Sequence, residues 1–186
     1  MLYFAGNVWI NDHSVILTNL QLMDHSLNIA LEAGMLIEST AALDDTVFAG
    51  VTIFLSAYNE KGAMGFIANQ PFGRSLHELA AFSRVPAFPL YHGGPVDEDH
   101  LYFLYCRPDL IPGGRQVYGD IHTEGDFEQA VRLLEQGQLK RGDIKIFVGY
   151  CGWDTGELEA EIAEGSWLVH PVEKDSAASL LASVFQ

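Results

Sequence analysis

Basic residues are scarce in this chain. Its 186 residues include 25 Asp and Glu but only 10 Lys and Arg, which gives a formal net charge of −15 at pH 7. The few Lys and Arg form no cluster along the sequence, so the positive surface that binds phosphate backbones is missing. The composition therefore disfavours direct binding to DNA or RNA.

Cysteine is also scarce. Cys106 and Cys151 are the only two, and they lie far apart with no C-x-x-C spacing. Two distant thiols of this kind are typical of buried cysteines, because a disulfide scaffold or a redox pair needs closer or more numerous ones. The same usage fits a reducing compartment, so we expect a cytoplasmic protein.

Several sequence signatures are missing. No apolar run approaches the ~18 to 20 residues needed to cross a membrane, and the N-terminus lacks the basic and apolar regions of a secretory signal. There is no P-loop, no G-x-G-x-x-G after a strand and no H-E-x-x-H or comparable histidine pair. We therefore expect no membrane association, no cofactor and no metal site.

The length and the 48% hydrophobic content favour a single domain with a sizeable core. Residues 1–22 show no clear pattern, whereas a helix is predicted from Asp24 to Ala33, with Asp24 as its cap and Gly34 as its stop. We predict one domain over residues 23–186. Residues 1–22 are then an upstream extension or a poorly ordered arm.

Strands and helices are both predicted along this domain. Strands are expected at 34–38, 47–57, 62–69, 88–92, 101–106, 116–122, 144–150 and 167–172. Helices are expected at 75–82 behind a capping box, at 127–136 before Gly137, after Gly156, and at 175–184. Strands that come both as hairpins and separated by helices indicate a mixed sheet.

The helix after Gly156 is strongly acidic. Asp154 or Thr155 is positioned to cap it, and Glu157 stands three residues after Asp154 as in a capping box. Glu157, Glu161 and Glu164 share one face of this helix. That face is either an exposed acidic surface or the lining of a site for a cation or a polar ligand.

Three loops combine Gly or Pro with polar or aromatic residues, and each follows an apolar strand: 69–73, 92–96 and 149–156. Such loops are fixed in shape, and at strand ends they are positioned to form one concave surface. We therefore predict a ligand-binding surface. Its candidate residues are Asn69, Pro71, His92, Gly93, Gly94, Gly152, Trp153, Glu157 and Glu161.

Three segments together resemble the AlgH/YqgE-like proteins, an uncharacterised bacterial family. They are GFIANQPFG at 65–73, HGGPV at 92–96 with LYFLY shortly after, and GYCGWDTGELEAEIAEGSW at 149–167. The resemblance covers roughly residues 34–172 and leaves 1–22 unmatched. It implies an α+β fold with a mixed, bifurcated and partly barrel-like sheet flanked by helices. The resemblance also implies a regulator of transcription. Because the net charge is −15, we expect this regulation to be indirect, through a protein or a small-molecule ligand.

Enzyme classes are less well supported. The nucleophile elbow G-x-S-x-G of serine hydrolases is absent, and Ser75 is better used as a helix cap. Cys151 precedes a helix start, where a thiolate is stabilised, but a buried small hydrophobic role is commoner for such a residue. An enzyme acting on a small polar substrate would use Glu157, Glu161 or His92 as acid or base. We expect a binding or regulatory module, with this enzyme as the alternative.

The third segment contains two tryptophans, Trp153 and Trp167. Trp167 is predicted to be a core residue, because a tryptophan more often anchors a core than a ligand. Trp153 lies in a loop between glycines. It either packs under the turn or presents a surface on which a ligand stacks.

Overall fold

The computed structural model describes residues 30–170 and 184–185. Leu31–Gln186 group into one compact unit, and the fold below is that of this unit. The predicted arm 1–22, the boundary at Met23 and most of the predicted helices at 24–33 and 175–184 lie outside the described residues. Residues 30–33, at the end of the first of these helices, are not helical.

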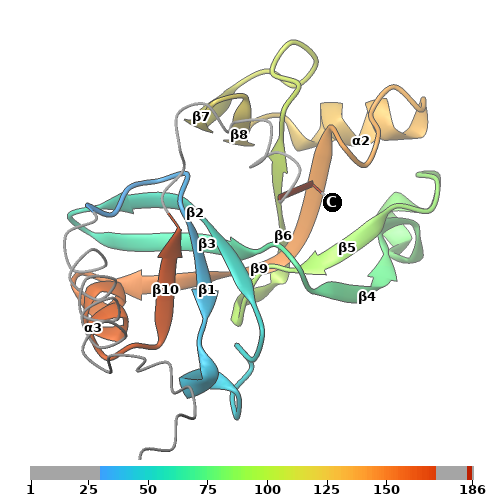
Figure 1. The fold of residues 1–186 in the computed structure, drawn as a ribbon. Coiled ribbons are helices and arrows are strands. Elements are labelled where there is room, and N and C mark those ends of the chain that lie inside the picture. The colour runs from blue at the N-terminus through green and yellow to red at the C-terminus, as the bar shows by residue number, and fades with distance from the viewer. Residues whose placement is uncertain (1–29, 171–183, 186) are drawn as a thin grey trace, which may run out of the picture. The chain divides into compact units, whose positions relative to one another are not determined.

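Ten strands form one curled sheet within the described ranges (Figure 1). They are β1 (Leu36–Ser39), β2 (Thr52–Asn59), β3 (Gly62–Ile67), β4 (Pro71–Ser75), β5 (Pro89–His92), β6 (Val96–Tyr105), β7 (Gly114–Tyr118), β8 (Ile121–Glu124), β9 (Ile144–Asp154) and β10 (Trp167–His170). The order is β10–β1–β2–β3–β9–β6–β8–β7, and β4 pairs with β5, which pairs with β9. The α-helices of the described part are α2 (Phe127–Glu135) and α3 (Glu157–Ala163). Within residues 30–170 and 184–185, strand therefore predominates over helix, in an α+β fold with few helices.

The long strand β9 is the centre of this sheet. Along one edge it pairs antiparallel with β6. Its other edge is divided, because β5 pairs parallel with Ile146–Val148 and β3 pairs antiparallel with the part from Cys151 to Asp154. Between these parts stands Gly149, with φ +69. Glycine adopts this left-handed conformation without the steric cost of a side chain, so β9 can serve two sets of neighbours.

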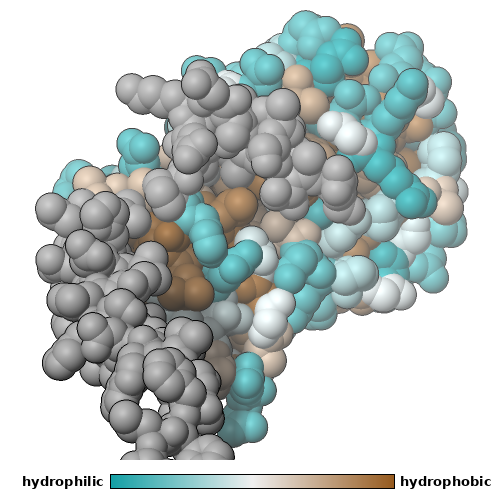
Figure 2. Space-filling model, viewed as in Figure 1, coloured by the Kyte–Doolittle hydropathy of each residue, from teal (hydrophilic) through white to brown (hydrophobic). Residues whose placement is uncertain are grey.

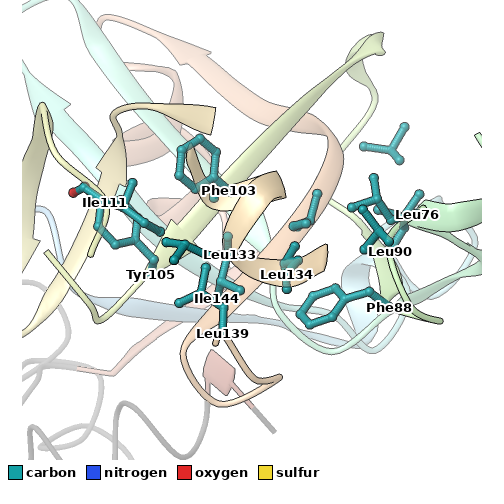
Figure 3. Packing of buried hydrophobic residues seen from close by; sticks show 14 residues of the cluster. Leu76, Phe88, Leu90, Phe103, Tyr105, Ile111, Leu133, Leu134, Leu139 and Ile144 are labelled. Carbon is teal, nitrogen blue, oxygen red and sulfur yellow. The ribbon is translucent and has the colours of Figure 1, made fainter. Parts of the chain in front are cut away.

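Alternation along β9 separates two clusters of buried residues. Ile144, Ile146 and Val148 face one cluster, which includes Leu133 and Leu134 of α2 (Figure 3). Phe147 faces the other, together with Phe54 and other aromatic residues. Successive side chains of a strand point to opposite faces, so the apolar run predicted as a buried strand is covered on both sides.

Helix α2 forms where the apolar spacing predicted it. The Asp126 side chain accepts a hydrogen bond from the backbone N–H of Gln129 at 2.8 Å, which caps the first turn. Ala130, Leu133 and Leu134 are buried. Gly137, with φ +68, follows the helix at the predicted stop.

Other predicted elements differ in extent. The strand expected at 116–122 is two strands, β7 and β8, because the chain reverses at Gly119 and Asp120. The helix expected at 75–82 is two 3₁₀ turns, η2 (Leu76–Glu78) and η3 (Ala80–Phe82). Strand β4 (Pro71–Ser75) pairs with β5 where a loop was expected at 69–73 and a helix cap at Ser75. These short segments are decided by neighbours distant in sequence rather than by their own composition.

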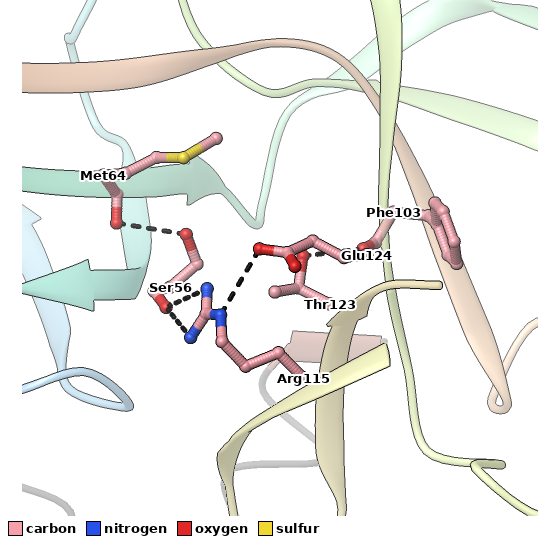
Figure 4. A network of polar contacts seen from close by, with 6 residues as sticks. All are labelled: Ser56, Met64, Phe103, Arg115, Thr123 and Glu124. Carbon is pink, nitrogen blue, oxygen red and sulfur yellow. Dashed lines mark hydrogen bonds and ion pairs between the residues drawn. The ribbon is translucent and has the colours of Figure 1, made fainter. Parts of the chain in front are cut away.

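Arg115 connects the β7–β8 hairpin to β2 (Figure 4). Its guanidinium donates hydrogen bonds to the Ser56 carbonyl at 3.4 and 3.5 Å and to the Glu124 carboxylate at 3.3 Å. The Ser56 hydroxyl in turn donates to the Met64 carbonyl at 3.2 Å. These contacts are long, so they orient the hairpin more than they stabilise it.

Within the described ranges, no helix is long and apolar enough to cross a membrane.

Candidate functional site

Most of the third predicted loop is strand, because β9 continues through it to Asp154, and the second predicted loop is in direct backbone contact with this strand. The N–H of Gly93 donates to the Val148 carbonyl at 2.8 Å, and the Gly93 carbonyl accepts from the N–H of Ile67 at 3.0 Å. The Cys151 thiol also donates to the Gly93 carbonyl, at 3.4 Å. A Cβ added to Gly93 would lie only 2.8 Å from the carbonyl carbon of Gly149. Only a glycine therefore permits this approach.

The first loop, 69–73, joins the same region through its backbone. The N–H of His92 donates to the Gln70 carbonyl at 2.9 Å. The Asn69 side chain accepts from the N–H of Thr52 at 3.0 Å and donates to the Gly50 carbonyl at 2.9 Å. Asn69 thus fixes the segment before β2. Pro71 lines a different hollow, of about 370 Å³, on the side of Arg74 and Arg141.

A hollow of about 340 Å³ lies beside α3 and contains four of the predicted residues. These four are Gly152, Trp153, Glu157 and Glu161. Its other lining residues are Phe48, Pro95, Val96, Cys151, Ala160 and Glu164. Three carboxylates and an apolar floor therefore share one space, and none of its lining residues is Lys or Arg.

Glu161 organises the aromatic side of this hollow. One oxygen of its carboxylate, Oε2, accepts hydrogen bonds from Trp153 Nε1 at 2.9 Å and from Trp167 Nε1 at 2.7 Å. The two indoles meet edge to face with ring centroids 6.1 Å apart, and Phe48 packs against Trp167 at 5.6 Å. Both tryptophans are buried, and Trp153 lies in strand β9 rather than in a loop while its side chain lines the hollow.

The start of α3 differs from the predicted cap. Gly156, with φ +85, is the N-cap residue, and no side chain caps the helix there. The Thr155 hydroxyl instead donates to the Glu60 carbonyl at 2.8 Å. Glu157 does reach back, accepting from the N–H of Asp154 at 2.7 Å. The correction has a physical reason: β9 continues to Asp154, so Asp154 and Thr155 are bound to β3 and its turn.

A second hollow, of about 300 Å³, contains His92 and Gly94. It shares Pro95 with the first hollow, and it is also lined by Val47, Ile67, Gln70 and Glu98. The His92 ring packs edge to face on Phe72, with centroids 4.7 Å apart. The predicted residues are therefore distributed over two hollows that share Pro95, and Asn69, Pro71 and Gly93 line neither of them.

The acidic run 97–100 follows these loops. Asp97 accepts hydrogen bonds from the Tyr102 hydroxyl at 2.6 Å and pairs with His100 Nδ1 at 2.7 Å. These bonds hold the pKa of Asp97 below its usual range, the bond from Tyr102 contributing most. Burial, followed by the bond to Asp97, raises the pKa of Tyr102 to about 12. Among the described residues, no group of three or more His, Cys, Asp or Glu is arranged to hold a metal ion.

Cys151 is not activated as a nucleophile. Its side chain is buried, and burial raises the pKa of the thiol to about 12. The reactive thiolate is therefore negligible at neutral pH. Cys106 is likewise a free thiol whose pKa burial raises.

Sequence reasoning missed Lys145. This residue of β9 is only 2% exposed, and its Nζ donates to the carbonyls of Ala68 at 2.7 Å and Val184 at 2.8 Å. The Nζ also lies 3.9 Å from the centroid of the Tyr91 ring. Burial lowers the pKa of Lys145 to about 8. The available signal was a single lysine within the otherwise apolar strand IKIFV, which implies a charge enclosed by the core.

Comparison with known proteins identifies the family. The profile of the AlgH-like family matches residues 35–183. A UPF0301 protein of Chlorobium luteolum is 40% identical over 74% of this chain and 72% of its own length, and one of Chlorobaculum tepidum is 37% identical over 74% and 73%. This chain therefore belongs to the AlgH-like family, as the three sequence segments indicated.

Solved structures agree with this assignment. The solution structure of the AlgH protein from Pseudomonas aeruginosa is similar with a TM-score of 0.65 and 25% identity, over 82% of this chain and 80% of that one. A crystal structure of a protein from Corynebacterium diphtheriae has a TM-score of 0.64 at 16% identity, covering 78% of each chain. The second similarity concerns the fold alone.

Proposed function

We propose that this AlgH-like chain is a binding module that recognises a positively charged group carried on an apolar body, such as a basic side chain of a partner protein or a small amine. The seat is the hollow beside α3. The observation that carries this proposal is the placement of Glu157, Glu161 and Glu164 around a floor that includes Phe48 and Trp153.

The chemistry of the lining supports a cationic ligand. Carboxylates attract an ammonium or guanidinium group, and aromatic residues pack against the apolar part of the same ligand. Glu157 and Glu164 are exposed, so their charge is available at the mouth of the hollow. The net charge of −15 adds a long-range attraction for cations and repels phosphate backbones. A regulatory role through a protein or small ligand follows more readily than one through DNA contacts.

The carboxylates also bear on the choice between binding and catalysis. Glu161 already accepts two indole N–H bonds, and Glu157 accepts from the backbone of Asp154. A general acid or base must exchange its proton with a substrate. His92 lies in the neighbouring hollow, against Phe72. Because their oxygens already accept these hydrogen bonds, Glu157 and Glu161 are better suited to binding a cation as fixed negative charges than to transferring protons.

The test uses benzylamine, which is an ammonium on an aromatic body at pH 7, and benzyl alcohol as the neutral control. Two-dimensional NMR of the protein follows the indole N–H of Trp153 during each titration. We expect benzylamine alone to shift this resonance, with an affinity that Glu164→Gln weakens by roughly threefold to tenfold, equivalent to about 0.7 to 1.4 kcal/mol.

The matched control is Glu128→Gln on α2. Glu128 is as exposed as Glu164 and its substitution makes the same change in net charge, but it does not line the hollow. We expect no change in affinity for this variant. Equal weakening by both substitutions would reduce the interaction to nonspecific charge attraction, and equal binding of benzyl alcohol would remove the role of the carboxylates.

A further inference from the structure

Lys145 places a positive charge inside the second buried cluster, on the same face of β9 as Phe147. Removing an ammonium from water is strongly unfavourable unless an anion compensates for it. Within residues 30–170 and 184–185, no carboxylate forms an ion pair with Lys145. Its recorded partners are two neutral carbonyls, those of Ala68 and Val184, and the face of the Tyr91 ring. Among the described residues, the hydrogen bonds of this lysine are therefore satisfied, but no anion compensates for its charge.

The surroundings of Lys145 are aromatic. Phe66 and Phe147 are fully buried and stack with centroids 4.9 Å apart. Tyr91, Tyr102 and Tyr150 are half-buried around the same cluster. On the face drawn in Figure 2, a group of hydrophobic residues is bordered by hydrophilic ones. Such a lining accepts an apolar body and leaves Lys145 as its one strongly polar partner.

The chain itself occupies this place. Val184 is completely buried in the cluster and Phe185 packs beside it. The Val184 carbonyl takes one of the Lys145 hydrogen bonds at 2.8 Å. A carboxylate oxygen at the same position would form a shorter, charge-assisted bond and would also neutralise the ammonium. The Val184 carbonyl therefore stands where the oxygen of an acid would bind better.

We propose that Lys145 and the aromatic face around it form a binding site for a carboxylate on an apolar body, such as a medium-chain fatty acid, and that Val184 and Phe185 close this site in the free protein. The site shares no residue with the hollow beside α3 and does not depend on the function proposed for it. The acid binds by displacing the Val184 carbonyl from Lys145. The acid and the Val184 carbonyl therefore compete for the same position beside Lys145.

The experiment titrates the full chain with octanoate, using 1-octanol as the neutral control of the same length. We expect octanoate to bind the wild type, to bind Val184→Gly about threefold to tenfold more tightly because the competing segment is weakened, and to bind Lys145→Met at least tenfold more weakly. The affinity for 1-octanol should be the same in the wild type and in Lys145→Met. Octanoate affinity that is unchanged in Lys145→Met, or in Val184→Gly, overturns the proposal.

A second measurement needs no substitution at Lys145. The Cε resonance of this lysine, followed by NMR in ¹³C-labelled wild-type protein, reports the titration of its ammonium. A bound carboxylate favours the charged form, so saturating octanoate should raise the pKa of Lys145 and saturating 1-octanol should not. A midpoint unaffected by octanoate overturns the proposal even if Lys145→Met fails to fold.

Discussion

Replacing Gly93 with alanine tests the contact that holds the loops together. Gly93 does not have a positive φ, so a methyl group adds no backbone strain there. The added Cβ would overlap the carbonyl oxygen of Gly149 and lie 2.8 Å from its carbonyl carbon, whereas ordinary contact begins near 3.4 Å. The opposing atoms are backbone. The two segments must therefore separate by more than about one ångström in a region of close packing.

The cost can be estimated from what the separation disturbs. Overpacking a closed contact costs about 1 to 3 kcal/mol. The bonds of Gly93 to Val148 and Ile67 are stretched as well, at about 0.5 to 1.5 kcal/mol each. We expect Gly93→Ala to lower the free energy of unfolding by about 2 to 6 kcal/mol in total. For a chain of this size the melting temperature should fall by roughly 4 to 24 °C.

Urea unfolding followed by tryptophan fluorescence, with thermal melts by circular dichroism, measures this loss. Gly142→Ala is the matched control, because Gly142 lies in a turn without positive φ and has no atom within 4 Å of an added Cβ. Its stability should change by less than about 1 kcal/mol, and in the stabilising direction. If Gly93→Ala is as stable as Gly142→Ala, Gly93 and Gly149 are not in the close contact described.

Three further predictions concern single residues. Gly149→Val should destabilise the protein by about 3 kcal/mol or more, because the φ of Gly149 is +69 and an added Cβ would lie 2.7 Å from the Val96 carbonyl oxygen. Gly152→Val should destabilise it clearly less, because a Cβ at Gly152 contacts only the Tyr150 ring. Equal losses of stability in urea unfolding would contradict this. Glu161→Ala should lower the free energy of unfolding by about 2 to 4 kcal/mol, because it leaves two buried indole N–H groups without an acceptor. Glu161→Gln keeps an acceptor oxygen and should lower it by only about 1 kcal/mol. Similar losses for the two variants would show that the indole groups do not depend on the Glu161 side chain. Burial lowers the pKa of Lys145 to about 8, so between pH 8 and its ordinary value near 10.5 the unfolded chain binds more protons than the folded one and stability rises with pH. The unfolding free energy of wild type relative to Lys145→Met should therefore rise by about 3 kcal/mol from pH 7 to pH 10.5, and a constant difference would show that this lysine is not desolvated.

Much of the local structure could be predicted from the sequence. Helix α2 was visible in the spacing of Phe127, Ala130 and Leu134, and β9 in its apolar run, because these patterns depend on the helix and strand periods alone. The three glycine-containing segments were sufficient to identify the family. The acidic face of α3 also followed directly from the helical spacing of Glu157, Glu161 and Glu164.

The arrangement of the site depended on the tertiary structure. Gly93 contacts Gly149, Glu161 joins two tryptophans, and Lys145 reaches Val184 only because segments far apart in sequence pair in one sheet. Period and composition show which face of a strand is apolar, but not which distant strand will lie beside it. Sequence by itself therefore determined the elements and the family of this protein. Long-range strand pairing decided which side chains share a hollow and which charge lies buried, because hydrogen bonds and packing between distant segments have no local signature.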